Sequence, residues 1–296
     1  MKLVLQNLGR QYRNGVWGLR ALSLSFAPGV VGVVGPVGAG KTTLMRLLST
    51  VISPTEGQAL ADERDIRRRA AAFRRRLGYL PQRFDVYAGL SARAFLNYVA
   101  AIKGVEAGQL PVAQAIDQVG LSEVADQKMG GYSLSLRRRV GLAQALLGQP
   151  RLLLIDEPGA ALPAEERQRF FRCLEQVLAA GVLEQALVLI ATENVADVAS
   201  LAGRLVLLQA GQVVWDASPD ELLRSVQGKV WAMPVDQTQL VEIKRQYLIS
   251  DLTRQGERVQ LRIVADASPG EKAAPVDPTP VDAYLYQMRR RNAAGL

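Results

Sequence analysis

A glycine-rich segment with one lysine and one threonine directly follows the apolar run 30–34. Its members are Gly35, Pro36, Val37, Gly38, Ala39, Gly40, Lys41 and Thr42. The glycines let the backbone turn so that several N–H groups point at one anion. The lysine adds a cation at the terminal phosphates, and the threonine hydroxyl can join the shell of Mg²⁺. The spacing G-x-x-x-x-G-K-[ST] therefore predicts a phosphate-binding loop (P-loop) for a nucleoside triphosphate, continued by Thr43 in the helix that follows.

Two carboxylates, Asp156 and Glu157, stand at the end of a second apolar run, 152–155. We expect Asp156 to hold Mg²⁺ beside the phosphates and Glu157 to polarise the attacking water as a general base. The alternative is an acidic pair that only solubilises a turn or caps a helix. Because a P-loop precedes this pair, the nucleotide site is the favoured interpretation.

The elements that must position these residues alternate between strand and helix. Expected strands are 2–5, 23–26, 30–34, 75–80, 152–155, 186–191 and 205–208; expected helices are 43–49, 90–103 with Ser91 as a cap, 112–119, 134–147 and 164–179. Such alternation is typical of an α/β fold with a mainly parallel sheet.

The pattern changes after residue 223. Two strands are expected at 230–235 and 259–264, with a mixed segment, 239–247, between them. The segment 268–280 is rich in proline, alanine and acid, which indicates an exposed loop. We therefore divide the chain into residues 1–225, which carry the nucleotide site, and a C-terminal accessory region, 226–296.

Composition limits the environment in which the chain works. With 296 residues, 49% of them hydrophobic, the chain can bury a sizeable core, yet no apolar stretch reaches the eighteen or so residues of a membrane span. One cysteine, Cys173, cannot form an internal disulfide, and the N-terminus lacks a signal-peptide pattern, so a cytoplasmic protein is expected. The net charge of +8 comes largely from arginine runs. Solvated helix faces are the favoured interpretation of these runs over anionic lipid or nucleic acid, and no nucleic-acid partner is expected.

These motifs together resemble the nucleotide-binding subunits of ATP-binding cassette (ABC) transporters, over about residues 1–225. The likeness is closest to single-domain ATPase subunits of bacterial exporters. The resemblance implies an ABC-type P-loop NTPase fold with an antiparallel β subdomain and a helical subdomain. It also implies ATP and Mg²⁺ as ligands, a second nucleotide-binding subunit across a dimer, and separate transmembrane permease subunits at the inner face of the cell membrane.

The resemblance assigns roles to further residues. Tyr12 matches the aromatic residue that stacks on adenine, although Trp17 is nearby and either ring could belong to the core. Gln82 matches the Q-loop glutamine, which touches Mg²⁺ and the attacking water, and the segment 84–104 that follows resembles the region that receives the permease. Ser133 and Ser135 match the signature segment, which clamps the γ-phosphate across the dimer.

Three positions depart from the family pattern. Ser135 replaces a signature glycine, Pro163 replaces the D-loop aspartate, and Glu193 replaces the switch histidine in a chain without any histidine. A glutamate at that position donates no hydrogen bond and places an anion against an anion. The departures predict ATP-driven dimer closure with weakened hydrolysis, in a homodimer or, more workably, a heterodimer. The alternative is a regulatory ATP-binding subunit that does not hydrolyse; a cassette acting on ribosomes or DNA is a third, less favoured possibility.

Overall fold

The computed structural model describes residues 1–105, 110–255 and 258–293. The chain divides into two units, which we describe separately. The first comprises Met1–Glu193 and Leu208–Val213, and the second Asn194–Leu207 and Val214–Leu296. The sequence-based boundary near residue 226 stays a prediction. Among the residues that the structure describes, no helix has the length and apolarity needed to cross a bilayer.

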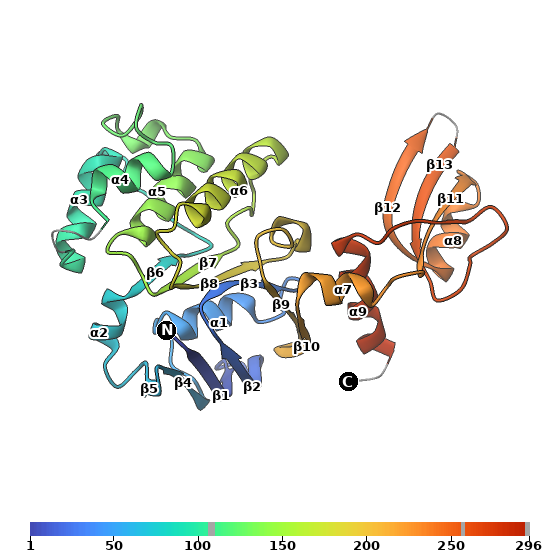
Figure 1. Ribbon diagram of the computed structural model, residues 1–296, viewed down its shortest axis with the longest axis horizontal. Coiled ribbons are helices and arrows are strands. Elements are labelled where there is room, and N and C mark those ends of the chain that lie inside the picture. Colours follow the sequence, from blue (N-terminus) through green and yellow to red (C-terminus); the bar gives the residue numbers. More distant parts are fainter. Residues whose placement is uncertain (106–109, 256–257, 294–296) are drawn as a thin grey trace. The chain divides into compact units, whose positions relative to one another are not determined.

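A six-stranded sheet carries the expected mainly parallel core (Figure 1). Its strands are β3 (Gly29–Val34), β6 (Leu77–Leu80), β7 (Leu152–Asp156), β8 (Leu187–Thr192), β9 (Arg204–Gln209) and β10 (Gln212–Ala217), in the order β10-β9-β3-β8-β7-β6. Strands β3, β8, β7 and β6 run parallel. Every residue of β7 and β8 is buried, as expected for strands covered on both faces.

Register brings the segments that carry chemistry to one edge of this sheet. Val34 pairs with Thr192, and Asp156 pairs with Ala191. Because the carboxyl ends of parallel strands share an edge, the P-loop, Glu157 and Glu193 all follow the sheet at that edge.

Helix α1 (Lys41–Leu48) contacts β7 and β8 of this sheet and also β2 of a second, antiparallel sheet. The second sheet has the order β2-β1-β4-β5 and consists of β1 (Leu3–Gln11), β2 (Trp17–Phe26), β4 (Glu56–Ala61) and β5 (Arg64–Asp65). The expected strands 2–5 and 23–26 are therefore parts of a longer hairpin. The antiparallel β subdomain implied by the resemblance is confirmed.

A helical layer completes the first unit. It contains α3 (Ala92–Lys103), α4 (Val112–Gln118), the short helix η1 (Met129–Gly131), α5 (Leu134–Leu146) and α6 (Ala164–Ala179). Ser91 caps α3 as expected, because its side chain accepts a hydrogen bond from the N–H of Ala94. The strand expected at 75–80 is partly wrong: Arg75 ends helix α2 (Ala70–Arg75), and β6 starts only at Leu77.

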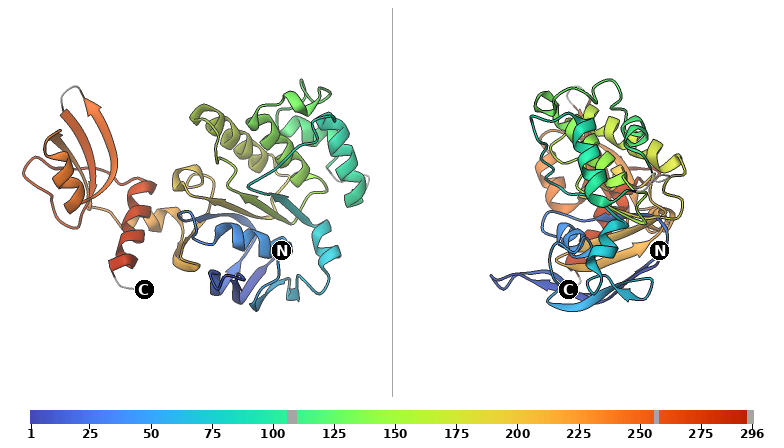
Figure 2. Two further views of the ribbon diagram at one scale, coloured as in Figure 1. Left: turned by 180° about the vertical axis from the view of Figure 1, so that it is seen from behind. Right: turned by 90° about the vertical axis from the view of Figure 1, so that its left-hand side faces the viewer.

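The second unit contains a four-stranded antiparallel sheet in the order β12-β13-β11-β14 (Figure 2). The strands are β11 (Val230–Asp236), β12 (Leu248–Gln255), β13 (Arg258–Val264) and β14 (Ala274–Pro275); the helices are η2 (Val195–Asp197), α7 (Pro219–Arg224), α8 (Leu240–Gln246) and α9 (Pro280–Ala293). Leu240 and Ile243 of α8 pack against the apolar core of this sheet. The expected exposed loop 268–280 holds the short strand β14, and β12 was not anticipated.

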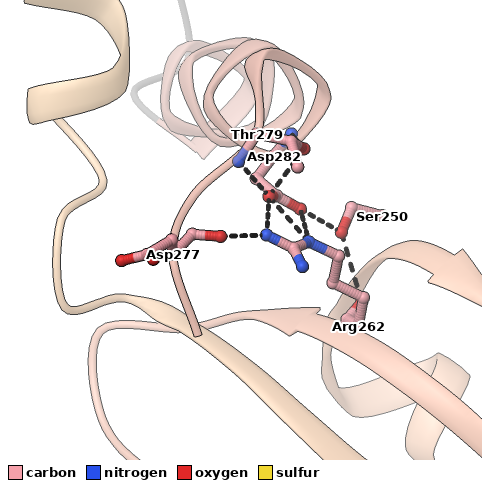
Figure 3. Close-up of polar contacts among 5 residues, drawn as sticks. All are labelled: Ser250, Arg262, Asp277, Thr279 and Asp282. Atoms are coloured by element: carbon pink, nitrogen blue, oxygen red, sulfur yellow. Dashed lines mark hydrogen bonds and ion pairs between the residues drawn. The ribbon is translucent and has the colours of Figure 1, made fainter. Parts of the chain in front are cut away.

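Helix α9 is tied to the C-terminal sheet through Asp282, whose side chain is fully buried (Figure 3). Nε of Arg262 donates to both carboxylate oxygens, at 3.0 and 2.8 Å. The N–H and hydroxyl of Thr279 and the hydroxyl of Ser250 supply further hydrogen bonds. Burial acts to raise the pKa of Asp282, but these donors outweigh it, so that the pKa lies below its usual value.

Candidate nucleotide-binding site

The P-loop connects β3 to α1 and contains two glycines, Gly35 and Gly40, where a side chain would clash with backbone. Gly40 has φ of +103°, and a Cβ at this position would lie 2.3 Å from the carbonyl oxygen of Gly18. A Cβ at Gly35 would lie 2.2 Å from the carbonyl oxygen of Leu208. Gly40 stands before the first turn of α1 without any side-chain cap, so the N–H groups of that turn remain available to an anion. Val37 is 82% exposed at the outside of the loop.

Lys41 is held inside the P-loop. Its Nζ donates to the carbonyl oxygens of Gly35 and Pro36, at 2.6 and 3.0 Å. It also lies 3.0 Å from Oε1 of Glu157. The structure therefore brings together the predicted phosphate-binding lysine and the predicted general base.

Thr42 and Asp156 form the second link between the P-loop and β7. The Thr42 hydroxyl donates to Oδ1 of Asp156 at 3.1 Å. Burial raises the pKa of Asp156 to about 6, against the effect of the Thr42 hydrogen bond, and the charge of Glu157 adds to the rise.

The same pair of residues fits a magnesium ion. Oδ2 of Asp156 is buried and has no hydrogen-bond partner, which leaves one carboxylate oxygen for a cation. No group of three or more His, Cys, Asp or Glu residues that could hold a metal is present in the described ranges. Magnesium needs no such group, because it is bound through one or two carboxylates together with the phosphates of its nucleotide. We conclude that Thr42 and Asp156 fit Mg²⁺.

Glu157 adopts a conformation that is uncommon for a residue with a side chain. Its φ is 48°, in the left-handed region, and its N–H donates to the carbonyl oxygen of Ala191 at 2.9 Å. Burial raises the pKa of Glu157, and the charge of Glu193 raises it further, whereas Lys41 and the backbone N–H of Glu193 lower it. Such strain is found where a side chain must be aimed at a reacting group.

Tyr12 lies against the start of α1. Its hydroxyl lies 3.0 Å from Oγ1 of Thr43, and the guanidinium of Arg10 stands over its ring, 5.6 Å from the centroid. One edge of the ring contacts Gly18, since a Cβ at Gly18 would meet Cε2 of Tyr12 at 2.8 Å. The predicted adenine-stacking residue is therefore next to the P-loop helix, and its stacking role stays a prediction.

Gln82 follows β6 at the same edge of the sheet, because Leu80 pairs with Ile155 just before Asp156. Its side chain is exposed and makes no hydrogen bond within the described part of the chain. Its role at Mg²⁺ and the attacking water also stays a prediction.

Comparison with known proteins identifies this arrangement. A family model described as ABC transporter matches residues 19–160. The phosphonates import ATP-binding protein PhnC 1 of Rhodopseudomonas palustris (strain HaA2) is 33% identical over 258 residues, covering 79% of this chain and 90% of the relative. The chain belongs to the ATP-binding proteins of ABC transporters. Membership in this family implies that ATP is the nucleotide of the P-loop.

Other ABC proteins share parts of the chain. The probable multidrug ABC transporter ATP-binding protein YbhF of Escherichia coli (strain K12) is 28% identical over 248 residues, which are 82% of this chain but 42% of YbhF. The dimeric structure of MJ0796, a bacterial ABC transporter cassette, superposes with a TM-score of 0.64 at 22% identity, over 73% of this chain and 98% of the other. The superposition shows that the fold is the ABC-type α/β fold with a mainly parallel core sheet and an antiparallel subdomain.

The two predicted signature residues of this ABC protein lie at the start of helix α5. Ser133 is the N-cap of α5, where its side chain accepts a hydrogen bond from the N–H of Leu136 at 3.3 Å. Ser135 follows in the first turn and is 7% exposed. Within the ranges that the structure describes, neither hydroxyl bonds to a P-loop residue. The predicted helix start is confirmed, and the expected clamp across a dimer is untested.

The other two positions that are predicted to depart from the family pattern, Pro163 and Glu193, also lie next to element ends. Pro163 is the N-cap residue of α6, with φ of −55°, and it supplies no side-chain cap. Glu193 follows β8 and is exposed, and its backbone N–H acts to lower the pKa of Glu157. Glu193 thus lies near the predicted general base, and its correspondence to the family's histidine stays a prediction.

One residue that supports the candidate site was not predicted from the sequence. It belongs to the arginine run 137–139, which we interpreted as a solvated helix face. Arg138 is only 6% exposed, and its Nη1 donates to the carbonyl oxygen of Pro81 at 3.2 Å. It therefore supports the backbone directly before Gln82. The helical period of α5, which turns the middle arginine of the run inward, is the signal that could have revealed it.

Proposed function

We propose that this chain is the ATP-binding subunit of a membrane transporter and that ATP closes it against a second nucleotide-binding subunit, with weakened hydrolysis. The observation that carries the proposal is the convergence of Lys41, Thr42, Asp156 and Glu157 at one edge of the sheet. Closure driven by binding can itself move a permease, because a ligand shifts the equilibrium toward the state that it binds better.

The residues of the site divide the work on the nucleotide. The N–H groups of the P-loop and the Lys41 ammonium bind the phosphates, and Tyr12 orients the adenine by stacking. Thr42 and Asp156, with Gln82, hold Mg²⁺, which when bound neutralises charge on the β- and γ-phosphates. Glu157 is the base that takes a proton from the attacking water. Since Glu157 pairs with Lys41 in this structure, the phosphates must take its place at the ammonium before it can act.

Three residues argue for slow turnover. At Ser135 a side chain stands where the family has glycine, and at Pro163 a carboxylate and a backbone donor are absent. At Glu193 the histidine donor is replaced by an acid. Losing one donor to a developing charge costs about two to three orders of magnitude in rate. A like charge at 4 Å adds about 4 kcal/mol at an effective dielectric of 20.

These departures favour a heterodimer. Each nucleotide in such a dimer lies between one subunit's P-loop and the other subunit's signature helix. A homodimer would combine all three departures in both sites. A partner with the usual family residues at all three positions would change this. The site at this chain's P-loop would then contain only one departure, Glu193. The site at the partner's P-loop would contain the other two, Ser135 and Pro163. The dimeric MJ0796 cassette shares the fold and supports the geometry of such closure.

The permease is proposed to dock beside the segment that follows Gln82. Four large apolar side chains are exposed there: Tyr87 by 63%, Leu90 by 39%, Tyr98 by 59% and Ile102 by 68%. We propose export as the direction, supported by the 82% of this chain that aligns with the multidrug protein YbhF. Because the permease is a membrane protein, the chain is proposed to bind at the inner face of the cell membrane.

Affinity purification of the tagged chain from detergent-solubilised membranes tests the proposal. A permease should co-purify with the chain, and its loss in a Tyr87→Ser/Leu90→Ser variant would locate the contact.

Nucleotide binding is tested by calorimetry on the purified chain with ATP and Mg²⁺. We expect saturable heat that disappears in Lys41→Ala. The absence of heat from the unmodified chain would overturn the proposal.

Single-turnover hydrolysis, measured with and without a second nucleotide-binding subunit, separates the two candidate functions. A slow rate that the partner increases supports a transporter ATPase, whereas no hydrolysis in either case supports the regulatory subunit, which the same three departures also favour.

A further inference from the structure

A cavity lies within the first unit, lined by β5, by the start of the chain and by α2. Its volume is about 470 Å³, within the range of roughly 300–1,000 Å³ that small-molecule sites occupy. Figure 1 shows β5 and α2 as neighbours at the edge of the antiparallel sheet. None of the P-loop residues, and none of the carboxylates of the nucleotide site, lines this cavity.

The cavity combines an apolar wall with a cationic rim. Ile66 is 3% exposed and Phe73 is half-buried, and both face the cavity together with small alanines. Four exposed arginines line it as well: Arg64, Arg69, Arg75 and Arg76. Two aspartates, Asp62 and Asp65, are the acids of the lining. Four cations against two anions leave the side chains of the lining with a net positive charge.

The two aspartates are already engaged by backbone donors. Asp62 accepts a hydrogen bond from the N–H of Lys2 at 2.9 Å, and Asp65 accepts one from the N–H of Arg67, also at 2.9 Å. The four arginines that line the cavity form no ion pair or hydrogen bond through their guanidinium groups in the described part of the chain.

Neighbouring arginines that do have partners lie outside the cavity lining. Arg67 donates to the carbonyl oxygen of Ile52 at 3.0 Å, and Arg74 donates to the hydroxyl of Thr50 at 2.9 Å. The unpartnered cations are thus concentrated at the cavity. Guanidinium groups match phosphate oxygens with paired, charge-assisted hydrogen bonds, and they lose less hydration than ammonium groups on binding.

From this combination we infer that the cavity binds a phosphate monoester that carries an apolar group, with the phosphate among Arg64, Arg69, Arg75 and Arg76 and the apolar group against Ile66 and Phe73. The compound can come from two sources, a soluble alkyl phosphate or the head of phosphatidic acid in a bilayer. The site is separate from the nucleotide site, and the inference does not depend on the proposed function.

Titration calorimetry with hexyl phosphate tests the inference. Because the P-loop also binds phosphate, every titration uses the full chain with Lys41→Ala. Hexyl phosphate should bind at least tenfold more tightly than inorganic phosphate or hexanol. Equal affinities of hexyl phosphate and inorganic phosphate would overturn the role of the apolar wall and with it the inference.

Two double variants distinguish binding at the cavity from a general effect of positive charge on the surface. Arg69→Gln/Arg75→Gln removes two cations of the lining, and Arg68→Gln/Arg172→Gln removes two exposed arginines that do not line the cavity. The first should weaken hexyl phosphate binding at least tenfold, and the second less than twofold. Equal losses would overturn the inference. Thermal melting confirms that each variant is folded.

Vesicles identify the source. Phosphatidylcholine vesicles with and without phosphatidic acid are sedimented with the same variants. Retention that requires phosphatidic acid and is lost in Arg69→Gln/Arg75→Gln supports the lipid source. Binding of hexyl phosphate without retention on vesicles supports the soluble source.

Discussion

The ammonium of Lys41 lies 3.0 Å from Oε1 of Glu157, and the two side chains are only 5% and 8% exposed. The group that should bind the phosphates and the group that should activate water therefore neutralise each other in this structure. Breaking such a pair leaves two buried charges, which is costly unless a new partner arrives. In the proposed mechanism, the phosphates of ATP would supply that partner to Lys41 and release Glu157 to act as the base.

Replacing Glu157 by glutamine should tighten ATP binding and abolish hydrolysis. The nucleotide then no longer competes with a charged hydrogen bond worth about 1.5 kcal/mol, so Kd should fall roughly tenfold. Calorimetry without Mg²⁺ measures this effect apart from catalysis. Glu175→Gln, an exposed glutamate on α6, is the control and should leave Kd unchanged. An unchanged or weaker affinity of Glu157→Gln would show that the ion pair does not oppose binding.

The pKa of Asp156 near 6 predicts a pH-dependent stability difference. The pKa is raised in the folded state, so the stability that its proton provides is present below about pH 4 and lost as pH rises through 6. Asp156→Asn should therefore match the unmodified chain near pH 4.5 more closely than at pH 7.5. At pH 7.5 the variant should be more stable by up to about 3 kcal/mol, because it avoids burying a charge. Urea unfolding in nucleotide-free buffer measures both values.

A second readout of Asp156 concerns magnesium. In the unmodified chain, the enhancement of ATP binding by Mg²⁺ should decline as pH falls below about 6, since the carboxyl then carries a proton. In Asp156→Asn the enhancement should be small at every pH. An enhancement that is independent of pH in the unmodified chain would contradict the assignment of Asp156 as a ligand.

Two substitutions of Glu193 should accelerate hydrolysis to different extents. Glu193→Gln removes the charge beside Glu157 and should increase the single-turnover rate severalfold. Glu193→His also restores a donor and should increase the rate by roughly 10²-fold. Quench-flow with a slight excess of chain over ATP measures both rates. If both variants matched the unmodified chain, the Glu193 side chain would not face the γ-phosphate.

Asp282→Asn should destabilise the C-terminal unit without weakening ATP binding. Arg262 would lose its buried partner, at a cost of about 3–5 kcal/mol. Since the pKa of Asp282 is lowered, the stabilisation is present above about pH 4 and lost as pH falls further. Hydrogen exchange should accelerate in β12 and β13, and calorimetry with ATP should be unchanged. The control is Asp251→Asn, which changes an exposed aspartate on β12; it should neither lower the stability of this unit nor accelerate hydrogen exchange.

Local patterns in the sequence predicted most of the first unit. The P-loop, the strand before Asp156 and helix α6 carry their signals within a few residues, and the start and end of α6 were predicted at the observed positions. The pairing of Lys41 with Glu157 could not be predicted in this way, because 116 positions separate them and only the strand order brings them together. The strand expected at 75–80 was partly wrong because arginine and alanine favour the helix that ends at Arg75.

The three residues that are predicted to depart from the family pattern share one structural feature, their place at the ends of elements. Glu193 directly follows a strand, and Ser135 and Pro163 stand where helices start. None is inside the fully buried strands, so substitutions at these positions are expected to leave the core sheet intact, including those proposed here to slow hydrolysis. On the proposed function, a few substitutions at the ends of these elements would separate a subunit that hydrolyses ATP from one that only binds it, with the same fold in both.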